Sequence, residues 1–92
     1  MSEQALILPE SAGIADVAAL RETLFTLIDE GAGASLTVDC SAVRSIDAAS
    51  LQCLLVARRK AQAAGGTLAL ANPSEDFKRY VSYVGLSADL IN

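Results

Sequence analysis

The chain has 92 residues, of which 52% are hydrophobic and only 4% aromatic, and its formal net charge is −4 at pH 7. This length predicts one small domain, residues 1–92, with a single core built mainly from aliphatic side chains. The sequence contains no histidine, and its two cysteines, Cys40 and Cys53, do not form a Cys-x-x-Cys pair. Zinc sites and imidazole acid–base catalysis are therefore excluded, and we expect no metal, no cofactor and two buried thiols.

The charges are divided unevenly along the chain. Residues 1–40 carry seven acidic side chains and one basic, whereas residues 41–92 carry six basic and four acidic. This division favours charge-guided docking to a protein partner, while the acidic total and the lack of interleaved aromatics argue against nucleic acid. No apolar run approaches the roughly 20 residues that span a bilayer, and no secretory signal is visible. We expect a cytoplasmic protein without direct membrane insertion.

The first half of the chain predicts a strand, a helix and a second strand. Ala5–Leu8 is short, apolar and followed by proline, which is typical of a strand near a sheet edge. Asp16–Ile28 has apolar residues at helical spacing, and Gly31 and Gly33 are placed to end that helix. In the strand Leu36–Cys40, either Leu36, Val38 and Cys40 form a single inward face or both faces of the strand are covered.

The second half predicts two more helices around a third strand. The first of these helices is expected at Ala48–Ala63, and the Gly65-Gly66 pair turns the chain into the strand Thr67–Ala71. Ser74 is a suitable N-cap for the last helix, which Gly85 should end. Four residues give that helix an apolar face: Phe77, Tyr80, Val81 and Val84. Strands that alternate with helices predict an α/β fold with a parallel or mixed sheet.

The segment Arg44–Leu51 joins the strand Leu36–Cys40 to the helix expected at Ala48. Asp47 stands where the N-cap belongs, so its carboxylate can accept hydrogen bonds from the free backbone N–H groups of the next turn. Those N–H groups and the helix dipole also favour negative charge at this point. The residues that follow Asp47 therefore determine whether this helix start can carry or bind a phosphate group.

This pattern of strand, loop, Asp-x-x-small-Leu resembles the STAS domain, the fold of bacterial anti-sigma factor antagonists. The resemblance extends over most of the chain, from the strand Ala5–Leu8 to the segment that ends Val84-Gly85-Leu86. It implies a single small STAS-like α/β domain, with a mixed β-sheet of about four strands and helices packed mainly on one face.

The family's usual loop reads Asp-Ser/Thr-Ser/Thr-Gly-Leu, and a partner kinase phosphorylates the first hydroxyl residue. Here the five positions read Asp47-Ala48-Ala49-Ser50-Leu51, so the position of the phosphoacceptor is occupied by Ala48. Alanine has no hydroxyl group, and the usual phosphorylation is chemically excluded. Ser50 and Ser45 are the alternatives for a displaced phosphoacceptor, although a phosphate on Ser50 would be repelled by Asp47.

The resemblance implies a non-enzymatic regulatory adaptor of a bacterial signalling system. Because the unphosphorylated family members bind their partner, Ala48 should mimic a permanently binding-competent state. Three kinds of partner are open: an anti-sigma serine kinase, a chemotaxis histidine kinase, and the ATPase of a phospholipid-transport complex. The residues expected to bind the partner are Arg44, Ser45, Asp47, Ala48, Ala49, Ser50, Gln52 and Arg59.

Other interpretations stay open beside the adaptor. Asp47 has a structural role as an N-cap whether or not it contacts a partner, and Arg58-Arg59-Lys60 is either a solvated helix end or a steering patch for an acidic surface. No nucleophile–base set or phosphate-binding glycine loop supports an enzyme. A small-ligand or nucleotide sensor and a homodimer are the remaining alternatives.

Overall fold

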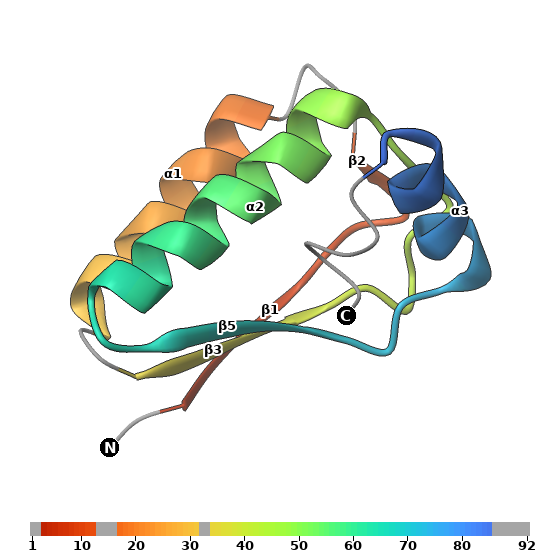
Figure 1. The fold of residues 1–92 in the computed structure, drawn as a ribbon. Helices are drawn as coiled ribbons and strands as arrows, with labels where there is room; N and C mark the ends of the chain where they lie inside the picture. The colour runs from red at the N-terminus through yellow and green to blue at the C-terminus, as the bar shows by residue number, and fades with distance from the viewer. Residues whose placement is uncertain (1–2, 13–16, 32–33, 86–92) are drawn as a thin grey trace.

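The computed structural model describes residues 3–12, 17–31 and 34–85 (Figure 1). The strands, in chain order, are β1 (Glu3–Ile7), β2 (Ser11–Ala12), β3 (Ser35–Asp39), β4 (Ser45–Ile46) and β5 (Thr67–Ala71). The helices are α1 (Val17–Glu30), α2 (Ala48–Ala63) and α3 (Glu75–Tyr83). Strands β1, β3 and β5 form one sheet in that order, and β2 pairs with β4 in a second, two-stranded sheet.

Helices α1 and α2 lie side by side over one face of the three-stranded sheet, and α3 lies at the end near β2 and β4 (Figure 1). The pairings of β1 with β3, β3 with β5, and β2 with β4 are all parallel. Parallel neighbours need crossover connections, and helices supply them here. The α/β class with helices on one face is confirmed, and within the described residues every strand pairing is parallel.

The core lies between the sheet and the two helices above it. Alternate residues of β3, Leu36 and Val38, are buried, as is Cys40 just beyond the strand, so the predicted inward face is confirmed. From α2 the buried residues are Ser50, Leu51, Cys53, Leu54, Leu55, Ala57 and Ala61. The small side chains Ala57 and Ala61 let this helix lie close to its neighbours, which compensates for the scarcity of aromatic residues.

The helix boundaries follow the sequence signals closely. Helix α2 begins and ends at the predicted residues, and Gly65, which takes a left-handed φ of 87°, follows its C-cap. Gly85 similarly has a φ of 75° just past α3. In α3 Phe77 and Val81 are buried, whereas Val84 is exposed, so the predicted apolar face is shorter than expected.

Helix α1 runs two residues further than predicted, to Glu30, while Asp16 and Gly33 lie outside the described residues. The same holds for the closing turn or helix expected after Gly85. Strand β1 occupies a sheet edge, as its sequence predicts. Within the described ranges, no helix combines the length and the apolar character needed to cross a membrane.

Candidate functional site

The start of α2 is built by a capped turn directly after β4. Asp47 has extended backbone angles (φ −95°, ψ 171°), and its Oδ1 accepts a hydrogen bond of 2.8 Å from the backbone N–H of Ser50. The first helical bond follows, from the N–H of Leu51 to the carbonyl oxygen of Asp47 at 3.1 Å. The predicted N-cap is therefore confirmed, and the carboxylate satisfies one of the N–H groups that a helix start leaves free.

The residues after the cap differ in how much of them a partner could reach. Ala48 and Gln52 are exposed, Ala49 is half-buried, and Ser50 is only 1% exposed. A kinase would have to open the first turn of α2 before it could reach the Ser50 hydroxyl. The accessible surface of this helix start is therefore formed by methyl groups and one amide side chain.

Arg44, just before β4, and Ser45, its first residue, lie beside a segment that sequence patterns did not single out. The carbonyl oxygen of Glu10 accepts hydrogen bonds from the backbone N–H groups of Arg44 (2.7 Å) and Ser45 (3.0 Å). The Ser45 hydroxyl donates to the Ser11 hydroxyl at 3.3 Å, and an exposed ion pair of 3.8 Å links Arg44 to Glu10. Two-residue strands such as β2 and β4 carry no periodicity, so only the pairing itself reveals Glu10 and Ser11 as neighbours of the site.

The start of α3 supports the loop that leads into β4. The Ser74 hydroxyl donates a 2.6 Å hydrogen bond to the carbonyl oxygen of Val43, and it accepts one of 3.0 Å from the N–H of Phe77. The backbone N–H of Ser74 also donates to the carbonyl oxygen of Cys40 at 3.3 Å. One side chain thus caps a helix and fixes the loop before the candidate site.

Three titratable side chains, at the end of β3 and on α2, have shifted pKa values. Hydrogen bonds from the Ser41 hydroxyl and backbone N–H hold the pKa of Asp39 below its usual range, as expected for a carboxylate that ends a strand. Burial raises the pKa of the Cys40 thiol to about 12, and burial also raises the pKa of Cys53. Both thiols are therefore protonated and inert near neutral pH. Among the described residues, no group of three His, Cys, Asp or Glu side chains could hold a metal ion.

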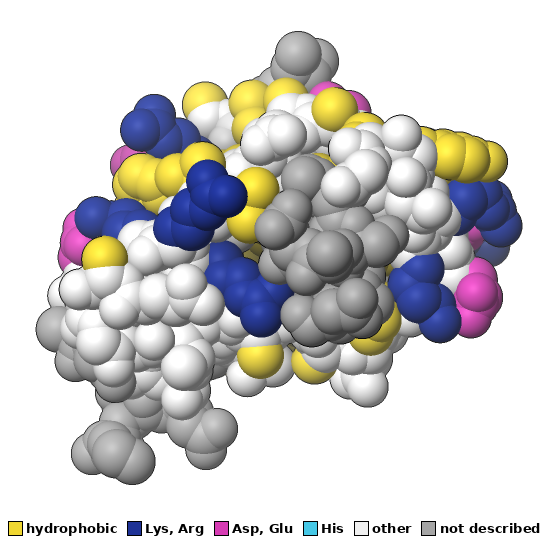
Figure 2. Space-filling model, in the orientation of Figure 1, with side chains coloured by type: hydrophobic (Ala, Val, Ile, Leu, Met, Phe, Trp, Pro, Cys, Tyr) yellow, Lys and Arg dark blue, Asp and Glu magenta, His cyan; other side chains and the backbone are white. Residues whose placement is uncertain are grey.

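The expected partner-binding residues fall into two regions. Arg44 and Ser45, at the start of β4, lie close to the Asp47–Gln52 turn. Arg59 lies about 16 Å from Ala48 along the axis of α2, at about 1.5 Å per residue. Arg59 belongs to the basic end of α2, which carries Arg58, Arg59 and Lys60 and no acidic residue. Figure 2 shows Lys and Arg side chains over α2 and, separately, around α3.

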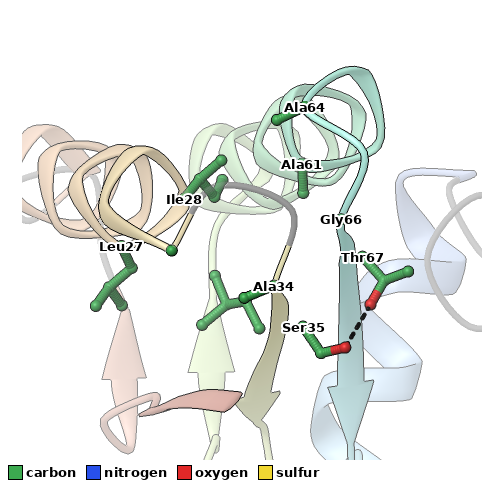
Figure 3. Close-up of a pocket in the computed structure, with 10 residues that line it drawn as sticks. Leu27, Ile28, Ala34, Ser35, Ala61, Ala64, Gly66 and Thr67 are labelled. Carbon is green, nitrogen blue, oxygen red and sulfur yellow. Dashed lines mark hydrogen bonds between the residues drawn. The ribbon is translucent and has the colours of Figure 1, made fainter. Parts of the chain in front are cut away.

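A small hollow lies at the opposite end of the helices from Asp47. It is bounded by the last turns of α1 and α2 and the first residues of β3 and β5, including Leu27, Ala34, Ala61 and Thr67 (Figure 3). Its volume is ≈ 10 Å³, about the space of one water molecule. This hollow cannot admit a nucleotide, so it gives no support to a ligand sensor.

The fold and the capped helix start define a small α/β domain with an accessible surface at one helix tip. The chain belongs to the STAS domain family, because the family model described as "Mlab, STAS domain" matches residues 2–92. STAS domains are in general non-enzymatic, regulatory binding domains that act through protein–protein interactions, and the anti-sigma factor antagonists are of this kind.

The same fold is found in a solved structure, the NMR structure of the protein TM1081. The two chains superpose with a TM-score of 0.77 at 23% sequence identity, over 94% of this chain and 69% of that one. At this level of identity the likeness establishes the fold alone. The search of curated proteins found no match.

Proposed function

We propose that this protein is a non-enzymatic regulatory adaptor that binds a signalling kinase or an anti-sigma factor through β4 and the start of α2. The observation that carries the proposal is the exposed Ala48 methyl on a fully formed, Asp47-capped helix start. The helix start itself carries no charge beyond the Asp47 cap, exposed Arg44 lies beside it, and the hydrogen bonds of the loop hold it in place. Such a pre-formed surface binds without an ordering cost.

The adaptor is permanently in its binding-competent form, because Ala48 cannot accept a phosphate. A phosphate displaced to Ser50 would require local opening, since that hydroxyl is buried. Ser45 is half-buried, so its hydroxyl is more accessible than that of Ser50, although it donates a hydrogen bond to the Ser11 hydroxyl. The adaptor is therefore not switched off by a serine kinase at the family's position.

Partners that need no serine acceptor fit this surface best. An anti-sigma serine kinase would stay bound to the adaptor, because it cannot phosphorylate Ala48 and so cannot dissociate by that route. A chemotaxis histidine kinase or the ATPase of a phospholipid-transport complex requires no acceptor in the adaptor at all. The basic residues Arg44 and Arg59 favour an acidic surface on whichever partner is bound.

Paired affinity capture tests the proposal, with the parent chain and its Ala48→Asp variant exposed to the same bacterial lysate. Mass spectrometry should find a kinase, an anti-sigma factor or a transport ATPase on the parent and not on the variant. The matched control is Ala19→Asp, which makes the same change at an exposed position in the first turn of α1. Equal capture by the parent and by Ala48→Asp would move the binding surface away from α2's start.

A further inference from the structure

Helices α1 and α2 carry opposite net charge, and the Lys60–Asp29 ion pair joins them within the chain. They run side by side in the same direction (Figure 1). Helix α1 carries Glu22, Asp29 and Glu30 against a single Arg21, whereas α2 carries three basic residues and no acidic one. An acidic helix beside a basic helix makes their outer face complementary to a copy of itself turned so that each helix meets the other kind.

The shapes of the two helices are also complementary, since one carries a projecting side chain and the other a groove. Val56 projects from α2 and is 47% exposed. On α1 lies a shallow, open groove of ≈ 360 Å³. The groove is lined by Ala18, Arg21, Glu22, Phe25, Thr26 and Asp29. It thus combines an aromatic ring and a methyl group with two carboxylates.

Contacts between α1 and α2 show which residues of the two helices lie at the same height along the helix axes. The Lys60 Nζ lies 3.4 Å from Asp29 Oδ1 and 5.2 Å from the centre of the Phe25 ring. Asp29 is therefore level with the last turns of α2, close to Arg59. Val56, one turn earlier on α2, is level with Phe25, one turn earlier on α1.

We propose that two copies of this chain associate through the outer face of α1 and α2. The two-fold axis runs parallel to α1 and α2 and lies above the line where they meet. Each α1 therefore lies over the α2 of the other copy, and every residue keeps its position along the helix axis. Val56 of each copy enters the α1 groove of the other, against Phe25, and Arg59 of each copy pairs with Asp29 of the other. Each contact occurs twice, as an isologous interface requires.

The test is sedimentation velocity on the full chain over a concentration series up to about 1 mM, where even an association of about 4 kcal/mol is detected. The mass should rise from monomer to dimer, and Arg59→Glu should raise the dissociation constant at least tenfold. Arg79→Glu on α3 is the matched control, since it makes the same charge change on an exposed surface outside this face.

A charge exchange between copies tests the pairing itself. Arg59→Glu and Asp29→Arg should each associate at least tenfold more weakly than the parent when alone, because both contacts in a homodimer would then join like charges. An equimolar mixture should form a dimer again, since every contact between the two variants joins opposite charges. The proposal is overturned by a monomeric parent at all concentrations, by equal effects of Arg59→Glu and Arg79→Glu, or by a mixture that stays monomeric.

Discussion

Helices α2 and α3 begin in the same way and continue differently. In α2 the side chain of Asp47 accepts the N–H of Ser50 at 2.8 Å, and in α3 the side chain of Ser74 accepts the N–H of Phe77 at 3.0 Å. Both caps therefore satisfy the N–H group three residues further on. The difference lies in the residues that follow each cap.

The first turn of α3 contains two acidic residues, whereas the first turn of α2 contains none. Glu75 and Asp76 follow the α3 cap and are themselves paired with Lys78 (3.0 Å) and Arg79 (3.1 Å). Helix α2 has no acidic residue in its first turn, where Ala48 is exposed. Acidic residues in the first turn stabilise a helix through the positive end of its dipole. Helix α3 has this stabilisation from its first turn, and α2 does not. We infer that α3 begins as a structural helix and that α2 begins as a surface kept open for a partner.

The largest expected effect comes from giving α2 the kind of first turn that α3 has. Ala48→Asp should lower affinity for the captured partner at least 100-fold, about 2.7 kcal/mol, because it places a charge where a methyl group is expected to be buried. The free energy of unfolding should stay unchanged or rise by about 0.3–1 kcal/mol, since the new carboxylate lies at the positive end of the dipole. Isothermal titration and urea unfolding measure the two quantities. A variant that loses affinity and stability together would point to misfolding instead.

The two caps should separate stability from binding. Asp47→Ala removes one capping bond and should cost about 1 kcal/mol. Ser74→Ala removes a cap and also the 2.6 Å bond to the carbonyl oxygen of Val43, so it should cost about 2 kcal/mol. Only Asp47→Ala should reduce partner affinity beyond what its loss of stability explains. If Ser74→Ala were the milder change in urea unfolding, the supporting role of α3 would be wrong.

The smallest effect is expected at Asp39, which precedes the loop to β4. The pKa of this carboxyl is held below 3.8, so its contribution to stability is fully present above pH 3.8 and is lost as the pH falls through the folded value. Asp39→Asn should therefore be slightly less stable than the parent at pH 6, and the difference should shrink as the pH falls below 3.8. Urea unfolding of both chains from pH 6 to strong acid measures this difference. A difference independent of pH would show that the carboxylate charge contributes nothing.

Local signals in the sequence predicted most of the fold. Caps, glycines and helical spacing located α2 to the residue, because Asp47 and Gly65 act within one turn of the positions they fix. The pairing of β2 with β4 was not predicted, since it depends on backbone contacts between residues 34 positions apart. Sequence patterns also placed Ser50 on the candidate surface, and only the packing of the first turn shows that it is buried.

The most direct test of the central claim is an NMR titration of the ¹⁵N-labelled chain with its captured partner, which compares the two helix starts in one experiment. The amide signals of Ala48, Ala49 and Gln52 should shift or broaden, while those of Asp76 and Phe77 stay in place. Perturbation of α3's start with an unchanged α2 start would contradict the assignment of the partner surface.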